Sequence, residues 1–555
     1  MTFTDPPRDF LRIGAALVSA CLLALSQPGF DVGPLSFVAL VPWTLAALAG
    51  GGRGGWKGDL LLGLVFFGVT VGWLRHVSWI AAGIVIVVCS LLVVVTGACF
   101  RRMARVVPAS IALPLAWTVG EFLRSVCPPG GFPYAYLGHG LYRTQPFPQV
   151  AALAGPYAVT FVAAAVNGAL ADGIAHALGL SRKGPRVRLV SFAIAGALFA
   201  LPFLVPIPPS EGPPGPAVHV VQANIPQPAK KEAWADYSRG GDMRERMFYD
   251  HLRLTKSIAD PGDLVVWAET MFPWNLGEGR AGEILDPATG VRAEDVRENE
   301  RVAIREEVMG HLGRSETSFL VGAFYYGRRD GAFRLFNAAL LFAPDGSRAG
   351  LYQKIHRVPG GEYLPWRESL PFVDAVGRWI EGWAGYLPDM AAGREPRVFR
   401  LRGRSGGDWR IGIAICYDNA YPDLFRQNAL EGADFHLVLS NEAHFLDSFE
   451  MDHLLAQAVL RAIETRRPVL RATNSGISAL VDATGRIVQV LEVDGRRKEV
   501  AGSLRFEVPP PGPLPPFARW GEFLSLASLG GSGLLLAIAG SRSRARVETR
   551  LRFRQ

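Results

Sequence analysis

Eight long apolar stretches are the feature of this chain that most constrains its fold. Seven of them precede residue 210, and one lies near the C-terminus. Each is close to the roughly 20 residues that a helix needs to cross a hydrocarbon core of about 30 Å. Buried helices of a large soluble protein are the alternative, but seven such segments in succession leave too little polar surface. We therefore expect a multi-pass α-helical membrane bundle. The stretches are residues 10–27, 34–50, 58–75, 77–100, 106–123, 148–178, 188–207 and 521–540.

Lysine and arginine in the connecting segments predict the orientation of the bundle, because basic loops remain in the cytoplasm. Basic residues gather before the first stretch, in every second loop and in the tail after the eighth stretch, whereas the intervening loops hold few. An even number of crossings places the two ends of the chain on the same side. We therefore expect both termini to be cytoplasmic and the large segment between the seventh and eighth crossings to lie outside.

The predicted domain organisation has four parts. Residues 1–210 form the seven-helix membrane region, and residues 211–517 form a large extramembrane domain. Residues 518–541 form the eighth transmembrane helix, and residues 542–555 form an Arg-rich cytoplasmic tail. Proline-rich segments bound the extramembrane domain on both sides, and such segments favour extended, semi-rigid connectors.

The formal net charge of +8 is compatible with a nucleic-acid-binding protein, but its distribution argues against one. Residues 211–518 hold 37 Lys or Arg and 42 Asp or Glu, a net charge of −5. The remaining residues hold 21 and 8, a net charge of +13. The positive charge therefore belongs to the membrane part, where it faces anionic lipid. We expect no nucleic-acid partner.

Short β-rich runs alternate with helical patterns between residues 217 and 508. This alternation predicts a layered α/β domain. The expected strands are 217–222, 263–267, 318–325, 338–342, 410–415, 435–440, 468–472 and 477–482. The expected helices are 233–259, 294–312 and 452–465.

Three residues with distinctive chemistry follow buried strands: Glu269, Lys354 and Cys416. Taken singly, each has an ordinary explanation as a helix-start carboxylate, a solvated lysine or a packed thiol. Cys416, however, is the only cysteine of the extramembrane domain, in a compartment where disulfides persist. An unpaired thiol there is a candidate nucleophile, which a carboxylate can deprotonate and a lysine can assist by stabilising an oxyanion.

Other polar residues give weaker signals. His436, His444 and His453 lack the compact spacing of metal ligands, so we expect no metal site. Glu121 and Asp172 lie in or at the ends of apolar stretches. Carboxylates there are functional candidates by default, although capping of a helix end is the alternative.

The order Glu, Lys, Cys, each after a strand, is similar to the catalytic triad of the nitrilase (carbon–nitrogen hydrolase) superfamily. Together with the membrane crossings, the sequence resembles the bacterial apolipoprotein N-acyltransferases over nearly the whole chain. Motifs that carry the resemblance lie at residues 222–227, 266–270, 352–365, 414–417, 440–445, 461–464 and 466–476.

This resemblance implies an αββα sandwich for the extramembrane domain and a role for each site residue. Glu269 would be the general base, Lys354 the oxyanion stabiliser and Cys416 the nucleophile. Glu362 matches the second glutamate of the family, which supports Lys354. Tyr417 follows the nucleophile, and its backbone N–H would be a second oxyanion donor.

The implied reaction is a double displacement without a cofactor. Cys416 would take an acyl chain from a phospholipid, typically phosphatidylethanolamine, and pass it to the α-amine of a diacylglyceryl-cysteine on an apolipoprotein. The implied location is the bacterial inner membrane, with a periplasmic catalytic domain and a monomeric chain. Two other hypotheses are a membrane-tethered amidase, in which water replaces the amine, and a lipid-binding relative without catalytic activity or with altered substrates.

Several positions depart from the family pattern. Asp418 replaces the usual Glu after Cys-Tyr, which keeps the charge and shortens the reach by one methylene. Lys231 stands where a Trp is common, and Ala268 stands where a Pro is common. Glu442 and His444 replace Asp and Trp. None of these changes removes a triad residue, but they leave the lipid preference open.

Overall fold

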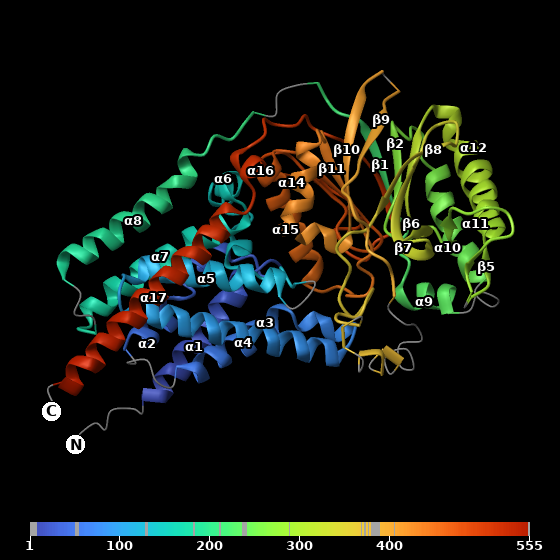
Figure 1. The fold of residues 1–555 in the computed structure, drawn as a ribbon. Coiled ribbons are helices and arrows are strands. Elements are labelled where there is room, and N and C mark those ends of the chain that lie inside the picture. The colour runs from blue at the N-terminus through green and yellow to red at the C-terminus, as the bar shows by residue number, and fades with distance from the viewer. Residues whose placement is uncertain are drawn as a thin grey trace. The chain divides into compact units, whose positions relative to one another are not determined.

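The computed structural model describes residues 8–552 apart from 50–54, 128–130, 181–183, 210–212, 236–240, 288, 368, 371–372, 376, 379–388 and 405. The chain forms two compact units (Figure 1). The helical unit comprises Met1–Ile207 and Trp520–Gln555, and the α/β unit comprises Pro208–Arg519.

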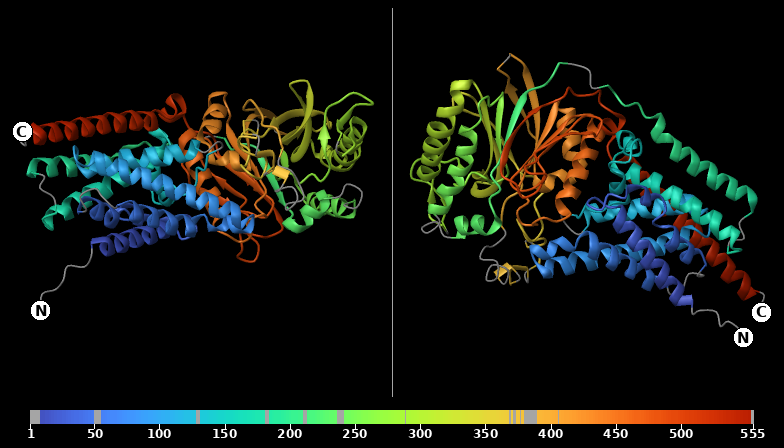
Figure 2. Two further views of the ribbon diagram at one scale, coloured as in Figure 1. Left: turned by 60° about the horizontal axis from the view of Figure 1, so that its bottom comes forward. Right: turned by 180° about the vertical axis from the view of Figure 1, so that it is seen from behind.

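Long apolar helices dominate the helical unit. Four of the described helices are long and apolar enough to cross a membrane: α4, α7, α8 and the Phe523–Arg542 part of α17. Helices α5, α7 and α17 pack side by side, as Figures 1 and 2 show. The α-helices are α1 (Arg8–Ser26), α2 (Val41–Ala49), α3 (Trp56–Thr70), α4 (Trp79–Met103), α5 (Ala109–Val126), α6 (Ala151–Ala154), α7 (Pro156–Ala177), α8 (Pro185–Leu204) and α17 (Phe523–Arg552). Short 3₁₀ helices lie at Gly33–Phe37, Gly72–His76, Leu137–Leu141 and Phe147–Val150.

The apolar stretch 148–178 does not form one helix. Gly155 interrupts it in a left-handed conformation (φ +76°), which is accessible to glycine without steric cost. Pro156 then begins α7, at a position where its missing N–H is harmless and its fixed φ suits the helix.

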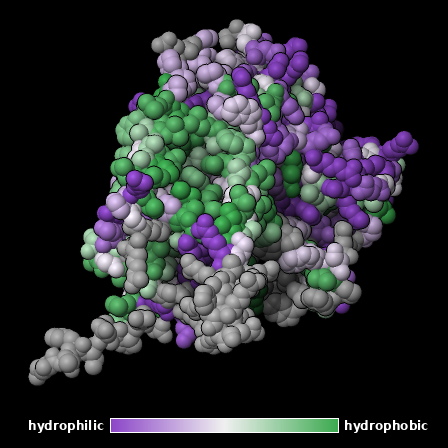
Figure 3. Space-filling view, turned by 60° about the vertical axis from the view of Figure 1, so that its left-hand side comes forward, coloured by the Kyte–Doolittle hydropathy of each residue, from purple (hydrophilic) through white to green (hydrophobic). Residues whose placement is uncertain are grey.

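The surface of the helical unit is apolar over a broad area (Figure 3). Large side chains of α8 and α17 are exposed, among them Leu189, Phe203, Leu204 and Leu526. Contiguous apolar surface of this extent is unusual on a soluble protein. It suits helices that are surrounded by hydrocarbon.

Carboxylates inside the helical unit hold neighbouring backbone segments. Glu121 is buried and accepts hydrogen bonds from the N–H of Leu137 (2.7 Å) and the hydroxyl of Thr160 (2.6 Å). Asp172 is also buried and accepts from the N–H of Ala109 (2.7 Å). Since buried N–H groups need acceptors, these contacts give both residues a structural role.

Two sheets form the centre of the α/β unit. The first has the order β15-β1-β2-β6-β7-β8, with β3 paired to β6, and the second has the order β14-β13-β12-β11-β10-β9. The first contains β1 (Ala217–Gln222), β2 (Leu264–Trp267), β3 (Leu276–Gly277), β6 (Ser318–Arg329), β7 (Ala332–Phe342), β8 (Arg348–Gln353) and β15 (Gly502–Glu507). The second contains β9 (Val398–Arg402), β10 (Asp408–Ile415), β11 (Phe435–Ser440), β12 (Val469–Thr473), β13 (Ala479–Val481) and β14 (Ile487–Val490). A separate pair joins β4 (Ile284–Asp286) and β5 (Val291–Arg292).

Helices cover the outer face of each sheet, so the unit is an αββα sandwich, as expected (Figure 1). Contacts of β1 with β12 and of β7 with β10 join the inner faces of the sheets. The first sheet is covered by α10 (Gly241–Lys256), α11 (Ala293–Asn299), a π-helix (Glu300–Val308) and α12 (Met309–Leu312). The second is covered by α14 (Pro422–Leu430) and α15 (Glu450–Thr465).

Strand direction brings several strand ends to one edge of the sandwich. Strands β1, β2 and β6 are mutually parallel, and so are β10, β11 and β12. Strand β8 is antiparallel to β7, which is antiparallel to β6, so β8 runs in the same direction as β2. Residues that follow β2 and β8 therefore lie at the same edge of the first sheet, and these are the positions of Glu269 and Lys354. Cys416 follows β10 in the second sheet and lies close enough for the charges of Glu269 and Lys354 to act on it.

Candidate active site

A strained turn after β2 positions Glu269. Thr270 has φ +52°, a left-handed conformation that β-branched residues rarely adopt. The turn passes so close to β6 that a Cβ on Gly322 would lie 2.6 Å from the Cα of Glu269. Only glycine at position 322 leaves room for this turn.

The buried carboxylate of Glu269 accepts three hydrogen bonds. Its Oε1 accepts from Asn337 Nδ2 (2.7 Å) and Lys354 Nζ (3.3 Å), and its Oε2 accepts from the N–H of Asn441 (2.8 Å). Burial alone would raise the pKa of Glu269. The charges of Lys354 and Lys230 and the two neutral donors outweigh burial, so the pKa lies below its ordinary value. At neutral pH Glu269 is therefore a carboxylate that can accept a proton.

Lys354 follows β8 and is almost completely buried. Its Nζ also donates to Glu362 Oε1 at 2.9 Å. Burial would lower its pKa, but the charges of Glu362 and Glu269 outweigh burial and raise the pKa well above its ordinary value. The site therefore contains a permanent ammonium held by two carboxylates.

Asn337 links those two carboxylates from the middle of β7. Its Nδ2 donates to Glu269 Oε1 and, at 3.0 Å, to Glu362 Oε1. Glu362 Oε2 accepts from the N–H of Val358 (2.9 Å), which ties the carboxylate to its own loop. The pair of glutamates is thus fixed by an amide and an ammonium together.

Cys416 lies at the end of β10, where the chain turns into a 3₁₀ helix (Cys416–Ala420). Its φ of +50° is left-handed, and such strain in non-glycine residues is concentrated at functional sites. The thiol is half-buried. Burial and the charge of Glu269 raise its pKa well above the ordinary value, and Lys354 opposes them. The resting thiol is therefore protonated and needs a base.

Asp418 connects the segments that present Cys416 and Lys354. Its buried carboxylate accepts from the N–H of Ile415 (3.0 Å) and the hydroxyl of Tyr352 (2.7 Å). It also accepts from the backbone N–H and Nδ1 of His356, both at 2.9 Å. Asp418 thus joins the end of β10, strand β8 and the loop after β8.

Aromatic rings lie next to this carboxylate. The ring of His356 stacks on Tyr421 with centroids 3.9 Å apart, and Tyr417 packs edge-on against Tyr421. Tyr417 directly follows Cys416, so this aromatic cluster lies beside that cysteine. His356 therefore both stacks on Tyr421 and donates to Asp418.

The structure thus gathers Glu269, Lys354 and Glu362 through direct contacts, and the charge of Glu269 acts on Cys416. Sequence reasoning missed Asn337 and Lys230. Asn337 is a polar residue directly before the apolar run 338–342, and an amide inside a buried strand is a signal that could have been used. Two buried ion pairs lie among residues of the sequence motifs that carry the family resemblance: Arg461–Glu464 and Arg471–Glu442.

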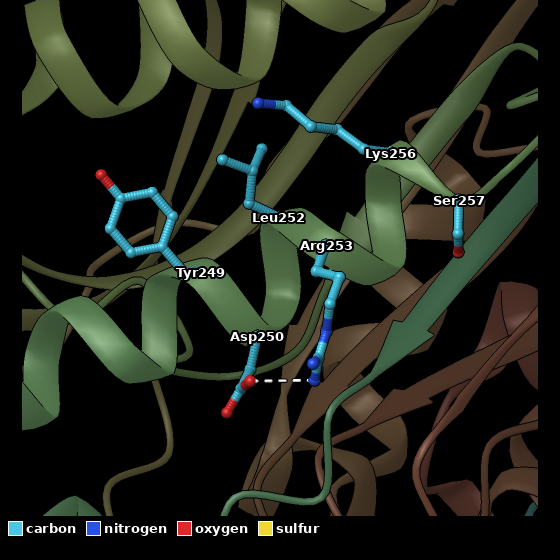
Figure 4. Close-up of a pocket in the computed structure, with 6 residues that line it drawn as sticks. All are labelled: Tyr249, Asp250, Leu252, Arg253, Lys256 and Ser257. Carbon is cyan, nitrogen blue, oxygen red and sulfur yellow. Dashed lines mark hydrogen bonds and ion pairs between the residues drawn. The ribbon is translucent and has the colours of Figure 1, made fainter.

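A pocket elsewhere in the α/β unit is separate from this site. It lies along one side of α10 and is lined by Tyr249, Asp250, Leu252, Arg253, Lys256 and Ser257 (Figure 4). An ion pair between Asp250 and Arg253 spans 3.0 Å there. Within the described part of the chain, no group of three His, Cys, Asp or Glu residues has the arrangement of a metal site.

Two family models match the chain. The apolipoprotein N-acyltransferase N-terminal domain matches residues 19–169, and the carbon–nitrogen hydrolase model matches residues 220–497. A helical membrane region followed by a carbon–nitrogen hydrolase domain defines a membrane-bound enzyme of the carbon–nitrogen hydrolase class.

Curated relatives narrow the assignment. An apolipoprotein N-acyltransferase from Rhizobium meliloti is 30% identical over 86% of this chain and 87% of its own length. One from Geobacter metallireducens is 28% identical over 87% of each chain. An amidase from Nesterenkonia sp., a solved structure, is 16% identical over 53% of this chain and 90% of its own, with a TM-score of 0.32. The chain belongs to the apolipoprotein N-acyltransferase family and is an acyltransferase.

Proposed function

We propose that this enzyme moves an acyl chain from a phospholipid to the α-amine of a diacylglyceryl-cysteine through a thioester on Cys416. The observation that carries the proposal is the contact of Lys354 with the carboxylate of Glu269, beside a protonated thiol. A base, a cation and a nucleophile in one buried site are the groups that acyl transfer requires.

The first half-reaction forms the thioester. Glu269 takes the proton of Cys416, and the thiolate attacks the ester carbonyl of the phospholipid. Lys354, with the backbone N–H of Tyr417, stabilises the negative charge on the carbonyl oxygen. The ester C–O bond breaks, Glu269 returns the proton to the departing oxygen, and a lysophospholipid leaves.

The second half-reaction forms the amide. The neutral α-amine of the lipoprotein attacks the thioester, Glu269 accepts a proton from the nitrogen, and the C–S bond breaks. That proton then returns to the sulfur, so Cys416 is again a thiol. Division of the transfer into two steps through a covalent intermediate lowers the barrier of each step.

The lipid substrates explain the helical unit. Both the donor and the acceptor carry acyl chains that reside in the bilayer, so the reacting groups must be reached from lipid. We place the α/β unit on the periplasmic side of the inner membrane, with residues 1–210 and 518–541 crossing it and both termini in the cytoplasm. Phosphatidylethanolamine is the expected donor and a monomer the expected state.

Mass spectrometry tests the proposal. Detergent-solubilised enzyme is incubated with phosphatidylethanolamine, and an acyl adduct on Cys416 is expected; a diacylglyceryl-peptide added afterwards should gain that acyl mass on its N-terminus. Cys416→Ala should abolish both signals, whereas Cys127→Ala, which changes an exposed cysteine of the helical unit, should retain them. Lipid hydrolysis with an unchanged peptide would instead indicate a hydrolase, and transfer by the Cys416→Ala variant would refute the nucleophile.

A further inference from the structure

A second lysine lies within the site. Lys230, on α9 (Gln227–Ala235), is only 7% exposed, and a buried ammonium requires partners. Its Nζ donates to the hydroxyl of Thr270, and that hydroxyl donates to the backbone carbonyl of Glu269 at 2.8 Å. A chain of two hydrogen bonds therefore runs from Lys230 to the turn that presents the catalytic carboxylate.

That turn needs support, because Thr270 is held at φ +52°. Left-handed backbone in a β-branched residue is strained and persists only where surrounding contacts enforce it. Gly322 provides space on one side of the turn, and Lys230 anchors the hydroxyl on the other. Without the ammonium, the Thr270 side chain would lose the donor that fixes it.

Lys230 also contributes to the charge balance between lysines and glutamates in the site. Glu269 and Glu362 share Lys354, so Lys230 supplies a second positive charge for the two carboxylates. Burial lowers the pKa of Lys230 to about 8, and the negative charge of Glu269 opposes this effect. Lys230 is therefore still largely charged at neutral pH.

We propose that Lys230 is a positioning residue for the acyl-transfer reaction, which anchors the Glu269–Thr270 turn and places a second ammonium beside the Glu269 carboxylate. This inference rests on the assignment of Glu269 as the general base. The charged or titratable groups that act on Glu269 come from four parts of the fold: Lys230 on α9, Lys354 and Glu362 after β8, Cys416 after β10, and Glu442 after β11. Asn337 on β7 and the N–H of Asn441 are its neutral donors.

The test is the pH dependence of Cys416 reactivity in the full-length enzyme. The alkylation rate of Cys416 by iodoacetamide is followed by peptide mass spectrometry, and thioester formation from phosphatidylethanolamine is followed in parallel. Loss of a neighbouring positive charge raises the pKa of a carboxylate. For Lys230→Met we therefore expect the acidic limb of both profiles to move upward by about one pH unit. Lys230→Arg, which keeps the charge, should restore the limb.

Matched variants separate positioning from a general loss of structure. Lys256→Met makes the same change at a half-exposed lysine of α10, whose Nζ lies 3.3 Å from Glu307, and should leave both profiles unchanged. Thr270→Val removes the bridging hydroxyl but keeps the charge, so it should lower the rate about equally at all pH values. The proposal would be overturned if the acidic limb of the Lys230→Met profiles did not shift, or if this variant lost the same fraction of its rate at every pH.

The two readouts also distinguish failure of this inference from failure of the proposed function. Alkylation needs no lipid, so it reports on Glu269 and Lys230 even if phosphatidylethanolamine is not a donor. If wild-type enzyme is alkylated at Cys416 but never acylated, phosphatidylethanolamine is not the donor. The role of Lys230 is then still measured by the pH dependence of alkylation. If Lys230→Met does not fold, Lys230→Arg and Thr270→Val still test the proposal. Lys230→Arg keeps both the positive charge and the Thr270 hydroxyl and should react at the wild-type rate, whereas Thr270→Val lacks the hydroxyl and should react more slowly.

Discussion

Lys354 lies closer to Glu362 than to Glu269: its Nζ is 2.9 Å from Glu362 Oε1 and 3.3 Å from Glu269 Oε1. Glu362 therefore binds the Lys354 ammonium more tightly than Glu269 does, and the Glu269 oxygen is held less strongly by that ammonium. A base must give up part of its charge to the proton it accepts. This difference supports the proposed division of roles, in which Glu362 stabilises Lys354 and Glu269 acts as the base.

Replacement of Lys354 should damage both activity and stability. Lys354→Met leaves two buried carboxylates without their shared cation, and loss of one member of a buried ion pair costs about 3–5 kcal/mol. Loss of an oxyanion donor lowers the rate by about 10²–10³-fold. Thermal unfolding in detergent and single-turnover thioester formation measure the two effects.

The double variant Lys354→Met/Glu362→Gln separates those effects. Since it removes one of the uncompensated charges, it should recover part of the unfolding temperature lost in Lys354→Met. It should not recover the rate, because the cation is still absent. Recovery of the rate would show that Lys354 acts only through the stability of the site.

Gly322 should be intolerant of any side chain. A Cβ at this position would lie 2.5 Å from the carbonyl oxygen of Ala268 and 2.6 Å from the Cα of Glu269, and both are backbone atoms that cannot move independently. Gly322→Ala should therefore displace the Glu269 turn and slow thioester formation by at least about tenfold, since small misplacements of reacting groups are costly.

A matched substitution checks this explanation. The nearest atom to a Cβ on Gly310, in α12, is the carbonyl oxygen of Arg305 at 3.9 Å. Gly310→Ala should retain full activity and the unfolding temperature of the wild type, or raise it slightly, because alanine is the better helix former. Equal activity of the two variants would show that the close approach at Gly322 is unimportant.

The buried strands and the layered α/β class could be predicted from the sequence because they are continuous apolar runs. The strand expected at 217–222 is β1 and the one expected at 435–440 is β11, with the same bounds. Strand β9 was missed because its burial alternates and two of its five residues are arginines. Where one helix was expected over 233–259, the structure describes two: α9, which begins at Gln227, and α10, which ends at Lys256.

The three proposed catalytic residues could be selected from the sequence because each follows a strand and their order matches a known family pattern. Their partners could not, since Asn337, Tyr352 and Lys230 are brought to the site by strand pairing and by packing between segments far apart in the chain. The substitution of Asp for Glu at position 418 has a structural counterpart: the shorter carboxylate is saturated by donors from Tyr352 and His356.

Asp418 should contribute stability that depends on pH. Burial would raise its pKa, but the hydrogen bond and charge of His356, together with Lys354, outweigh burial and lower it. A carboxyl whose pKa is lower in the folded state stabilises the protein above its unfolded value of about 3.9, and this contribution is lost as the pH falls through the folded value. Asp418→Asn should therefore lower the unfolding temperature at pH 7.

The difference between Asp418→Asn and the wild type should narrow as the pH is lowered below about 4. Thermal unfolding in detergent at a series of pH values measures it. At pH 7 we expect a loss of about 1–3 kcal/mol, because buried donors lose a charged acceptor. A difference that is constant across the series would show that Asp418 acts by shape alone.

The α/β unit should lose stability when one partner of the buried Arg471–Glu442 ion pair is removed, and it should lose less when both partners are removed. Arg471 also donates from Nη1 to the carbonyl oxygen of Leu454 at 3.3 Å, and both side chains of the pair are inaccessible to solvent. Arg471→Met should destabilise the α/β unit by up to about 3–5 kcal/mol. Burial already raises the pKa of Glu442, so uptake of a proton by this carboxyl should limit the loss.

Glu442 follows Asn441, whose N–H donates to Glu269 at 2.8 Å, so movement of this segment should also displace the carboxylate of Glu269. The double variant Arg471→Met/Glu442→Gln should unfold at a higher temperature than Arg471→Met and regain part of its rate of thioester formation. Arg301→Met, which breaks an exposed pair with Glu298, should change neither quantity appreciably because solvent screens such pairs. A double variant no more stable than Arg471→Met would mean that the guanidinium stabilises this segment through its carbonyl contacts and not through Glu442.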